Sequence, residues 1–208
     1  MNKKMCITYE VENGLYINMT NRCSNSCTFC IRNNGDTAYG SDSLWLEREP
    51  SVEEVLDAVF LRDVPKYDEV VFCGYGEPSY RLSDARVVAL KIKQKYPDAK
   101  VRINTNGQSD LILGVDSSEL YKDAFDAVSI SLNASNGTKY MEICRPVYKN
   151  SAFPAIIKFA ENVKKCVPKV VFSVVRETLD DIELYECEKI AERTGVPLKV
   201  RAYIGKEG

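Results

Sequence analysis

Histidine is absent from this sequence of 208 residues. Because imidazole is the side chain whose ordinary pKa lies near neutrality, general acid–base chemistry here must use other groups, and Ser–His or Cys–His arrangements are excluded. Long apolar runs are also lacking: nothing approaches the about 20 residues that a membrane span needs. Residues 1–8 contain no apolar signal segment. We therefore expect no contact with a membrane.

Neither sign of charge is in large excess, since 28 Lys and Arg face 30 Asp and Glu, for a net charge of −2. This balance gives no strong signal for nucleic-acid binding. Eight cysteines could form disulfides, but the chain is long for a disulfide scaffold and lacks a secretory start. Reduced thiols are the better interpretation, and they indicate a cytoplasmic protein.

Short apolar runs alternate with amphipathic stretches along the sequence, which predicts strands alternating with helices. The predicted strands are 15–20, 69–73, 100–104, 127–132, 169–175 and 198–204. The predicted helices are 51–62, 83–95, 116–122, 151–166 and 180–193. Ser51 and Glu54 form a capping-box pattern at the start of the first helix, and Gly195 suits the end of the last one.

Six strands alternating with helices imply parallel pairing through right-handed crossovers. A complete eight-fold barrel typically needs about 250 residues, so we predict a partial (βα)6 barrel in one domain, 1–208. Residues 5–11 and 15–20 flank the hairpin signal Asn13-Gly14, so residues 1–14 should add an N-terminal β-hairpin strand. Residues 35–50 form the longest irregular stretch, and Leu44, Trp45 and Leu46 would make it either a lid or an apolar anchor.

Cys23, Cys27 and Cys30 form a Cys-x-x-x-Cys-x-x-Cys pattern directly after the strand 15–20. Functional loops of βα folds follow the carboxyl ends of strands. Three thiolates at this spacing can hold three corners of a [4Fe–4S] cube and leave the fourth iron open for chemistry. The alternative is a structural zinc site, but zinc usually takes four ligands, and neither histidine nor a second cysteine pair is near.

A second motif follows the strand 69–73 and consists of Gly74, Tyr75, Gly76, Glu77 and Pro78. Glycines at a strand end allow a ligand to approach the backbone closely. The carboxylate of Glu77 could bind an ammonium group, and Pro78 stiffens the turn. Alone the motif often marks only a turn, but here it follows the cysteine loop by one βα unit.

Together the two motifs resemble those of the radical S-adenosylmethionine (SAM) superfamily, with Tyr75 in place of the first glycine of its Gly-Gly-Glu-Pro motif. The resemblance implies a [4Fe–4S] cluster whose open iron is chelated by SAM. It also implies reductive cleavage of SAM to methionine and a 5′-deoxyadenosyl radical, which abstracts hydrogen from a substrate. Phe29 would lie near the adenine, and Gly76 and Glu77 would hold the methionine amino group.

Further segments support the same resemblance. Residues 104–107, with Asn104 and Asn106, look like the superfamily's Thr-Asn-Gly segment. Along the strand 127–132, alternation places Ser129, Ser131 and Asn133 on one face, which we expect to face the barrel interior. There they could hydrogen-bond the SAM ribose; a surface-facing row is the alternative.

Two arginines are candidates for binding anionic groups. Arg145 resembles the arginine that pairs with the SAM carboxylate in several branches of the superfamily, and its planar fork suits that partner. A surface salt bridge is the alternative. Arg201 lies on the last predicted strand, where it could bind an anionic substrate or SAM if it faces inward, or could be exposed at the barrel edge.

Cys73 and Cys144 lie near the predicted active end of the barrel, and each could donate hydrogen to a substrate radical or ligate a second metal. Overall, the sequence looks closest to the small radical SAM proteins associated with TatD-type hydrolases. The resemblance implies a one-electron donor such as flavodoxin or ferredoxin, and it suggests a TatD-type hydrolase as a partner. A different hypothesis is a non-catalytic metal-binding module that regulates such a hydrolase; the substrate is not indicated.

Overall fold

The computed structural model describes residues 5–205, so residues 1–4 of the predicted hairpin segment lie outside the described residues. The strands are β1 (Thr8–Val11), β2 (Gly14–Ile17), β3 (Glu69–Phe72), β4 (Val101–Thr105), β5 (Ala127–Ser131), β6 (Lys169–Val175) and β7 (Leu198–Arg201). The α-helices are α1 (Val52–Phe60), α2 (Leu82–Lys95), α3 (Ser109–Leu113), α4 (Gly137–Cys144), α5 (Ala152–Val163) and α6 (Asp181–Thr194). Within this range no helix combines the length and apolar character that crossing a bilayer requires.

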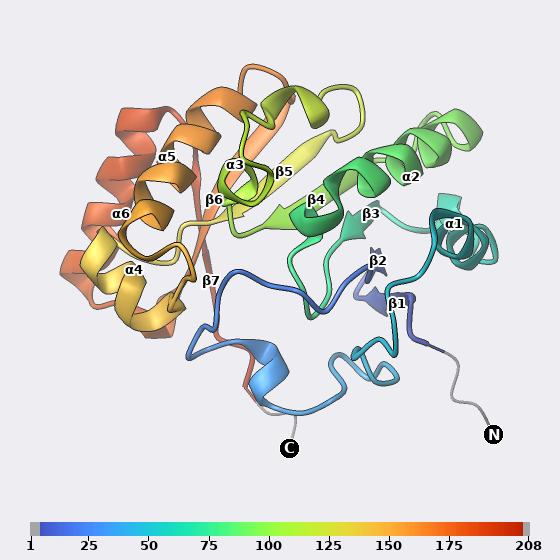
Figure 1. Cartoon of the computed structure of the whole chain (residues 1–208), viewed down its shortest axis with the longest axis horizontal. Coiled ribbons are helices and arrows are strands. Elements are labelled where there is room, and N and C mark those ends of the chain that lie inside the picture. The colour runs from blue at the N-terminus through green and yellow to red at the C-terminus, as the bar shows by residue number, and fades with distance from the viewer. Residues whose placement is uncertain (1–4, 206–208) are drawn as a thin grey trace.

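The strands form one sheet in chain order, from β1 to β7. β1 and β2 pair as an antiparallel hairpin, whereas every later pair is parallel. The helices lie on one side of the sheet, and the long segment between β2 and α1 lies on the other (Figure 1). This arrangement confirms the predicted partial barrel of βα units with an N-terminal hairpin.

The sheet has an apolar outer face and a polar inner face because side chains alternate along each strand. Residues such as Ile17, Phe72 and Ile130 are buried against the helices in the main core. Arg102 and Asn104 of β4 point the other way and are only half-buried. Residues that are paired between adjacent parallel strands lie on the same face of the sheet. Ser129 of β5 pairs with Asn104, so the inner face is polar on β5 as well.

The helix predictions were correct except around residues 109–144. The predicted helix 116–122 is only a short 3₁₀ turn, Ser118–Leu120, and the helices α3 and α4 were not predicted. α4 begins at a weak signal, an Asn136 cap followed by Gly137. It is stabilised instead by burial of Tyr140 and Ile143, which is a tertiary effect.

The insertion 35–50 has no helix or strand of its own, and its leucines anchor it. Leu44 and Leu46 are buried, and Leu44 packs in a small cluster with Tyr9 and Tyr75. Trp45 remains 39% exposed and makes an edge contact with the Tyr75 ring at 5.1 Å between centroids. The anchor interpretation therefore holds for the two leucines, while Trp45 lies at the surface.

Candidate active site

The cysteine loop leaves β2 and runs beside the end of α4. Ser26 N donates a hydrogen bond to Cys144 O at 3.0 Å, and Thr28 N donates to Ile143 O at 2.9 Å. In return, Val147 N donates to Ser24 O at 2.8 Å. The loop is therefore held along its length by backbone bonds to a segment more than 110 residues away in the sequence.

A buried polar network supports the same loop from below. Asn25 Nδ2 donates to the Tyr140 hydroxyl at 2.8 Å, and Gln108 Nε2 donates to Asn25 Oδ1 at 2.8 Å. Asn106 Nδ2 donates to Ser24 Oγ at 2.8 Å, so this motif residue fixes the cysteine loop. Buried polar groups linked in this way specify one loop position, because each would be costly to leave unpaired.

The three motif cysteines are half-buried in this loop. Burial raises the pKa of the Cys23 thiol to about 12 and also raises the pKa of Cys30, so metal binding must displace protons from these thiols. Within residues 5–205, no three Cys, Asp or Glu side chains gather closely enough to hold a single metal ion. Three thiolates in one loop are a donor set for a [4Fe–4S] cluster, whereas a structural zinc site usually takes four ligands.

Cys144 lies directly against Cys27. The two thiols are within hydrogen-bond reach, and this contact is the largest cause that raises the pKa of Cys27. Asn133 Nδ2 contacts Cys144 Sγ at 3.9 Å, and Cys144 is fully buried in the core. This position favours a role in packing the cysteine loop over the predicted donation of hydrogen to a substrate.

The predicted polar row of β5 divides into two parts. Ser129 and Ser131 are half-buried on the inner face. Asn133 follows the strand with a left-handed backbone (φ 59°) that turns it toward Cys144. Its Oδ1 is buried and has no partner among the described residues, so it is an open acceptor for a ligand hydroxyl.

Gly74 and Gly76 are required by neighbouring protein segments. A Cβ at Gly74 would lie 2.1 Å from Asn18 Oδ1, and one at Gly76 would lie 2.2 Å from Thr20 O. Glu77 N donates to Arg22 O at 2.7 Å, which joins the two segments. Gly74 thus makes room for the Asn18 side chain, and Gly76 makes room for the backbone that leads into the cysteine loop.

Glu77 is a buried carboxylate, 4% exposed, at the junction of three loops. Its Oε1 accepts hydrogen bonds from Ser79 N, Ser79 Oγ and Thr105 Oγ1 at 2.7–3.0 Å. From the described residues its Oε2 accepts one hydrogen bond, donated by Asn106 N at 2.6 Å. Burial raises the pKa of Glu77, and no described cation forms an ion pair with it. A free lone pair on Oε2 therefore suits a cationic ligand.

The remaining motif residues are spread around this junction. Tyr75 donates its hydroxyl to Gly35 O at 2.8 Å, so it anchors the insertion. Pro78 begins a 3₁₀ helix. Phe29 is half-buried against the main core. Arg145 is exposed at the end of α4 with φ 47°, and no ion pair is recorded for it within the described range.

The inner face below the loops carries Cys73, Asn104 and Arg201. Burial raises the pKa of Cys73, while Asn104, Arg102 and Arg201 act in the opposite direction. Arg102 also donates to Asn104 Oδ1. Cys73 therefore stays a candidate for contact with a substrate, since it lies on the face that the sheet encloses.

The functional residues that the sequence did not indicate are Ser24, Asn25, Gln108 and Tyr140. Each is buried and supports the cysteine loop. The only local signal was the position of Gln108 directly after the Asn106-Gly107 segment. Their partners are distant in sequence, so no pattern along the chain could have identified them.

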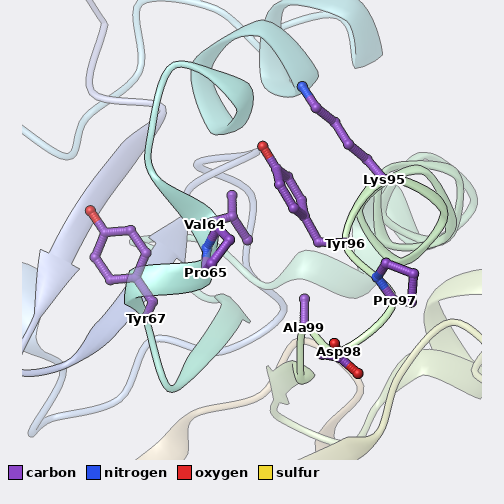
Figure 2. Close-up of a pocket in the computed structure, with 8 residues that line it drawn as sticks. All are labelled: Val64, Pro65, Tyr67, Lys95, Tyr96, Pro97, Asp98 and Ala99. Carbon is purple, nitrogen blue, oxygen red and sulfur yellow. The ribbon is translucent and has the colours of Figure 1, made fainter.

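A separate pocket of about 270 Å³ lies at the other end of the sheet (Figure 2). Its walls come from residues 64–67, which precede β3, and from residues 95–99, which precede β4. The cysteine loop instead follows the carboxyl end of β2. This pocket is therefore not part of the candidate site.

We expect Glu77→Gln to weaken both the loop junction and the binding of SAM. The amide would place N–H against the donor Asn106 N, which should cost about 1–3 kcal/mol of unfolding free energy, and it would remove the negative charge. Urea unfolding and SAM titration measure the two effects, with Glu186→Gln on the exposed face of α6 as the control. Unchanged SAM affinity would remove Glu77 from the cofactor site.

The fold and the site define an α/β protein with a three-cysteine loop at the carboxyl end of a partial barrel. The family model of the Radical SAM superfamily matches residues 17–187, so the chain belongs to this superfamily of enzymes. Members use a [4Fe–4S] cluster and SAM, which confirms the predicted class of cofactors. None of the curated proteins matched the sequence.

Several solved structures share the fold. SuiB of Streptococcus suis bound to the precursor peptide SuiA has a TM-score of 0.67 at 16% identity, covering 92% of this chain and 39% of that one. AnSMEcpe with bound AdoMet has a TM-score of 0.65 at 17% identity, covering 91% and 51%. A radical SAM methyltransferase from Sphaerobacter thermophilus has a TM-score of 0.61 at 15% identity, covering 94% and 68%. The chain thus spans about two fifths of the length of SuiB.

Proposed function

We propose that this protein cleaves SAM reductively at a [4Fe–4S] cluster held by Cys23, Cys27 and Cys30. One observation carries the proposal: hydrogen bonds join the three-cysteine loop to the segment that holds Glu77. The carboxylate of Glu77 is buried and has no cationic partner among the described residues. When bound, the cluster would supply the electron for reductive cleavage of SAM and so the radical chemistry that removes hydrogen from the substrate.

The chain's own residues would bind and orient SAM. Oε2 of Glu77 would accept a hydrogen bond from the methionine ammonium group, which would give this buried carboxylate its missing positive partner. Asn133 Oδ1, an open acceptor, and Ser131 would hydrogen-bond the ribose hydroxyls. Arg145 lies beyond the loop and would have to swing inward to reach the SAM carboxylate.

The same proposal extends to the surroundings of the enzyme. A one-electron donor such as flavodoxin or ferredoxin would reduce the cluster, and a cytoplasmic location would keep the eight cysteines reduced. A TatD-type hydrolase remains the proposed partner from the sequence resemblance. The alternative, a non-catalytic module with zinc, would need a fourth ligand besides the three thiolates of this loop.

The test is anaerobic reconstitution of the full chain with iron and sulfide. We expect a brown protein with about four irons per chain. It should release 5′-deoxyadenosine from SAM when dithionite is added, as measured by liquid chromatography, and should release none without reductant. A colourless protein that takes up one zinc and leaves SAM intact would contradict the proposal.

A further inference from the structure

The inner face of the sheet carries more positive than negative charge. Arg102 lies on β4, and register pairs it with Ala127 and then with Lys169 of β6. Lys199 and Arg201 on β7 pair with Ser173 and Val175 of β6. Paired residues of parallel strands share a face, so all four cations, Arg102, Lys169, Lys199 and Arg201, belong to the inner face together with one carboxylate, Glu69.

Glu69 is influenced by cations of several strands, although Lys169 and Lys199 are themselves exposed. The hydrogen bond from Arg102 lowers the pKa of Glu69, and Lys169 and Lys199 lower it further. Glu69 is on β3, whereas Lys199 is on β7, and β4, β5 and β6 lie between these strands in the sheet. Arg201 likewise acts on Cys73.

Only one of the four cations has an anionic partner. Arg102 Nε donates to Glu69 Oε2 at 2.9 Å, which neutralises both charges. Within residues 5–205, the side chains of Lys169, Lys199 and Arg201 form no ion pair and no hydrogen bond. Glu177 is the first carboxylate after the end of β6, but it accepts a hydrogen bond from Tyr203 N and forms no ion pair with these cations.

Arg201 is the most unusual of the unpaired cations. Its Nε is buried and has no partner among the described residues. The side chain of Arg81, by contrast, is largely buried and forms an ion pair with Asp84 at 2.6 Å. A guanidinium N–H that is withdrawn from water without an acceptor is costly, so an anionic ligand at this place would remove an existing penalty.

We propose that the substrate carries a phosphate or carboxylate group that binds between Lys199 and Arg201 on the inner face. Lys169, at the start of β6, adds positive charge on the same face and so attracts the anionic group. Lys199 lies two residues before Arg201 on one strand and faces the same way, roughly 7 Å nearer the amino end of β7, where its side chain is exposed. The site therefore extends inward from the rim where the cofactors bind. Calling the bound anion part of the substrate rests on the proposed function; the anion site itself does not.

The experiment titrates inorganic pyrophosphate into the reconstituted full chain by calorimetry, at constant ionic strength set with potassium chloride. Loss of a charge-assisted hydrogen bond should weaken pyrophosphate binding about tenfold in Lys199→Gln and in Arg201→Gln. Lys165→Gln, an exposed lysine after α5, is the matched control and should bind as the wild type does. Equal affinity in all four proteins would overturn the assignment.

SAM affinity and 5′-deoxyadenosine release are measured on the same samples. A loss of SAM affinity in Arg201→Gln that exceeds its loss of pyrophosphate affinity would overturn the assignment of Arg201 to the substrate. Pyrophosphate binding that depends on Lys199 and Arg201 in a protein that never cleaves SAM would overturn the proposed function and leave the anion site. SAM cleavage without any pyrophosphate binding would overturn the anion site alone.

Discussion

Replacing Cys27 with alanine is expected to abolish both iron loading and SAM cleavage. The loop offers three thiolates to hold the cube. Histidine, which could otherwise replace a lost thiolate, is absent from the chain. Cys144 lies beside Cys27 but is fully buried behind the loop, hydrogen-bonded through its backbone to Ser26. This backbone bond holds Cys144 in place, so we expect it not to substitute for Cys27.

The measurements are iron per chain, visible absorption and 5′-deoxyadenosine release after anaerobic reconstitution. Cys166→Ala is the matched control, because Cys166 follows α5, distant in sequence from the loop, and contacts Glu119 at 3.4 Å. It should keep full iron content. A Cys27→Ala variant that retains the absorption and cleavage rate of the wild type would show that Cys27 is not a ligand. Circular dichroism of both variants separates loss of the cluster from loss of the fold.

The order of strands could be predicted because each strand is a short apolar run bounded by polar residues. Lys169–Val175 was predicted to the residue, and the hairpin at Asn13-Gly14 formed where its turn signal lies. β7 ends at Arg201, three residues earlier than predicted, because the chain beyond it is exposed and bonds to loops such as Asn34. Strand existence is a local property, whereas strand length depends on the neighbour that it pairs with.

The helix α4 shows what the sequence could not reveal. Gly137-Thr138-Lys139-Tyr140 is a poor helical start by propensity. The helix forms because Tyr140 reaches Asn25 and Gln108, and because its last turn forms backbone bonds to the cysteine loop. Both are long-range contacts, and they decide where Cys144 lies. The packing position of Cys144 was therefore invisible in the sequence.

The candidate site was partly visible for a related reason. Cysteine spacing and the run Gly74–Pro78 are local patterns, and the family match places them in the superfamily where they were expected. The physical cause of the glycines differed from expectation, since a Cβ would meet the Asn18 side chain at Gly74 and the Thr20 backbone at Gly76. A sequence shows that a position needs glycine but does not show which neighbour excludes the side chain.

Replacing Gly76 with alanine is expected to displace the cysteine loop without touching any cysteine. The new Cβ would lie 2.2 Å from Thr20 O and 2.8 Å from Arg22 O. Both atoms belong to backbone, so no side chain can rotate to relieve the overlap, and overpacking of this kind costs roughly 1–3 kcal/mol or more. The hydrogen bond from Glu77 N to Arg22 O would lengthen at the same time.

Iron content after reconstitution should therefore fall several-fold in Gly76→Ala, and the midpoint of urea unfolding should decrease. Gly137→Ala is the control, because its Cβ would meet only Phe153 Cβ at 3.9 Å, an ordinary contact. Alanine also favours the helix there, so this variant should be at least as stable as the wild type. Wild-type iron content and stability in Gly76→Ala would mean that the β2 and β3 loops are not held together at this point. In that case the junction could not be what positions Glu77 relative to the three cysteines.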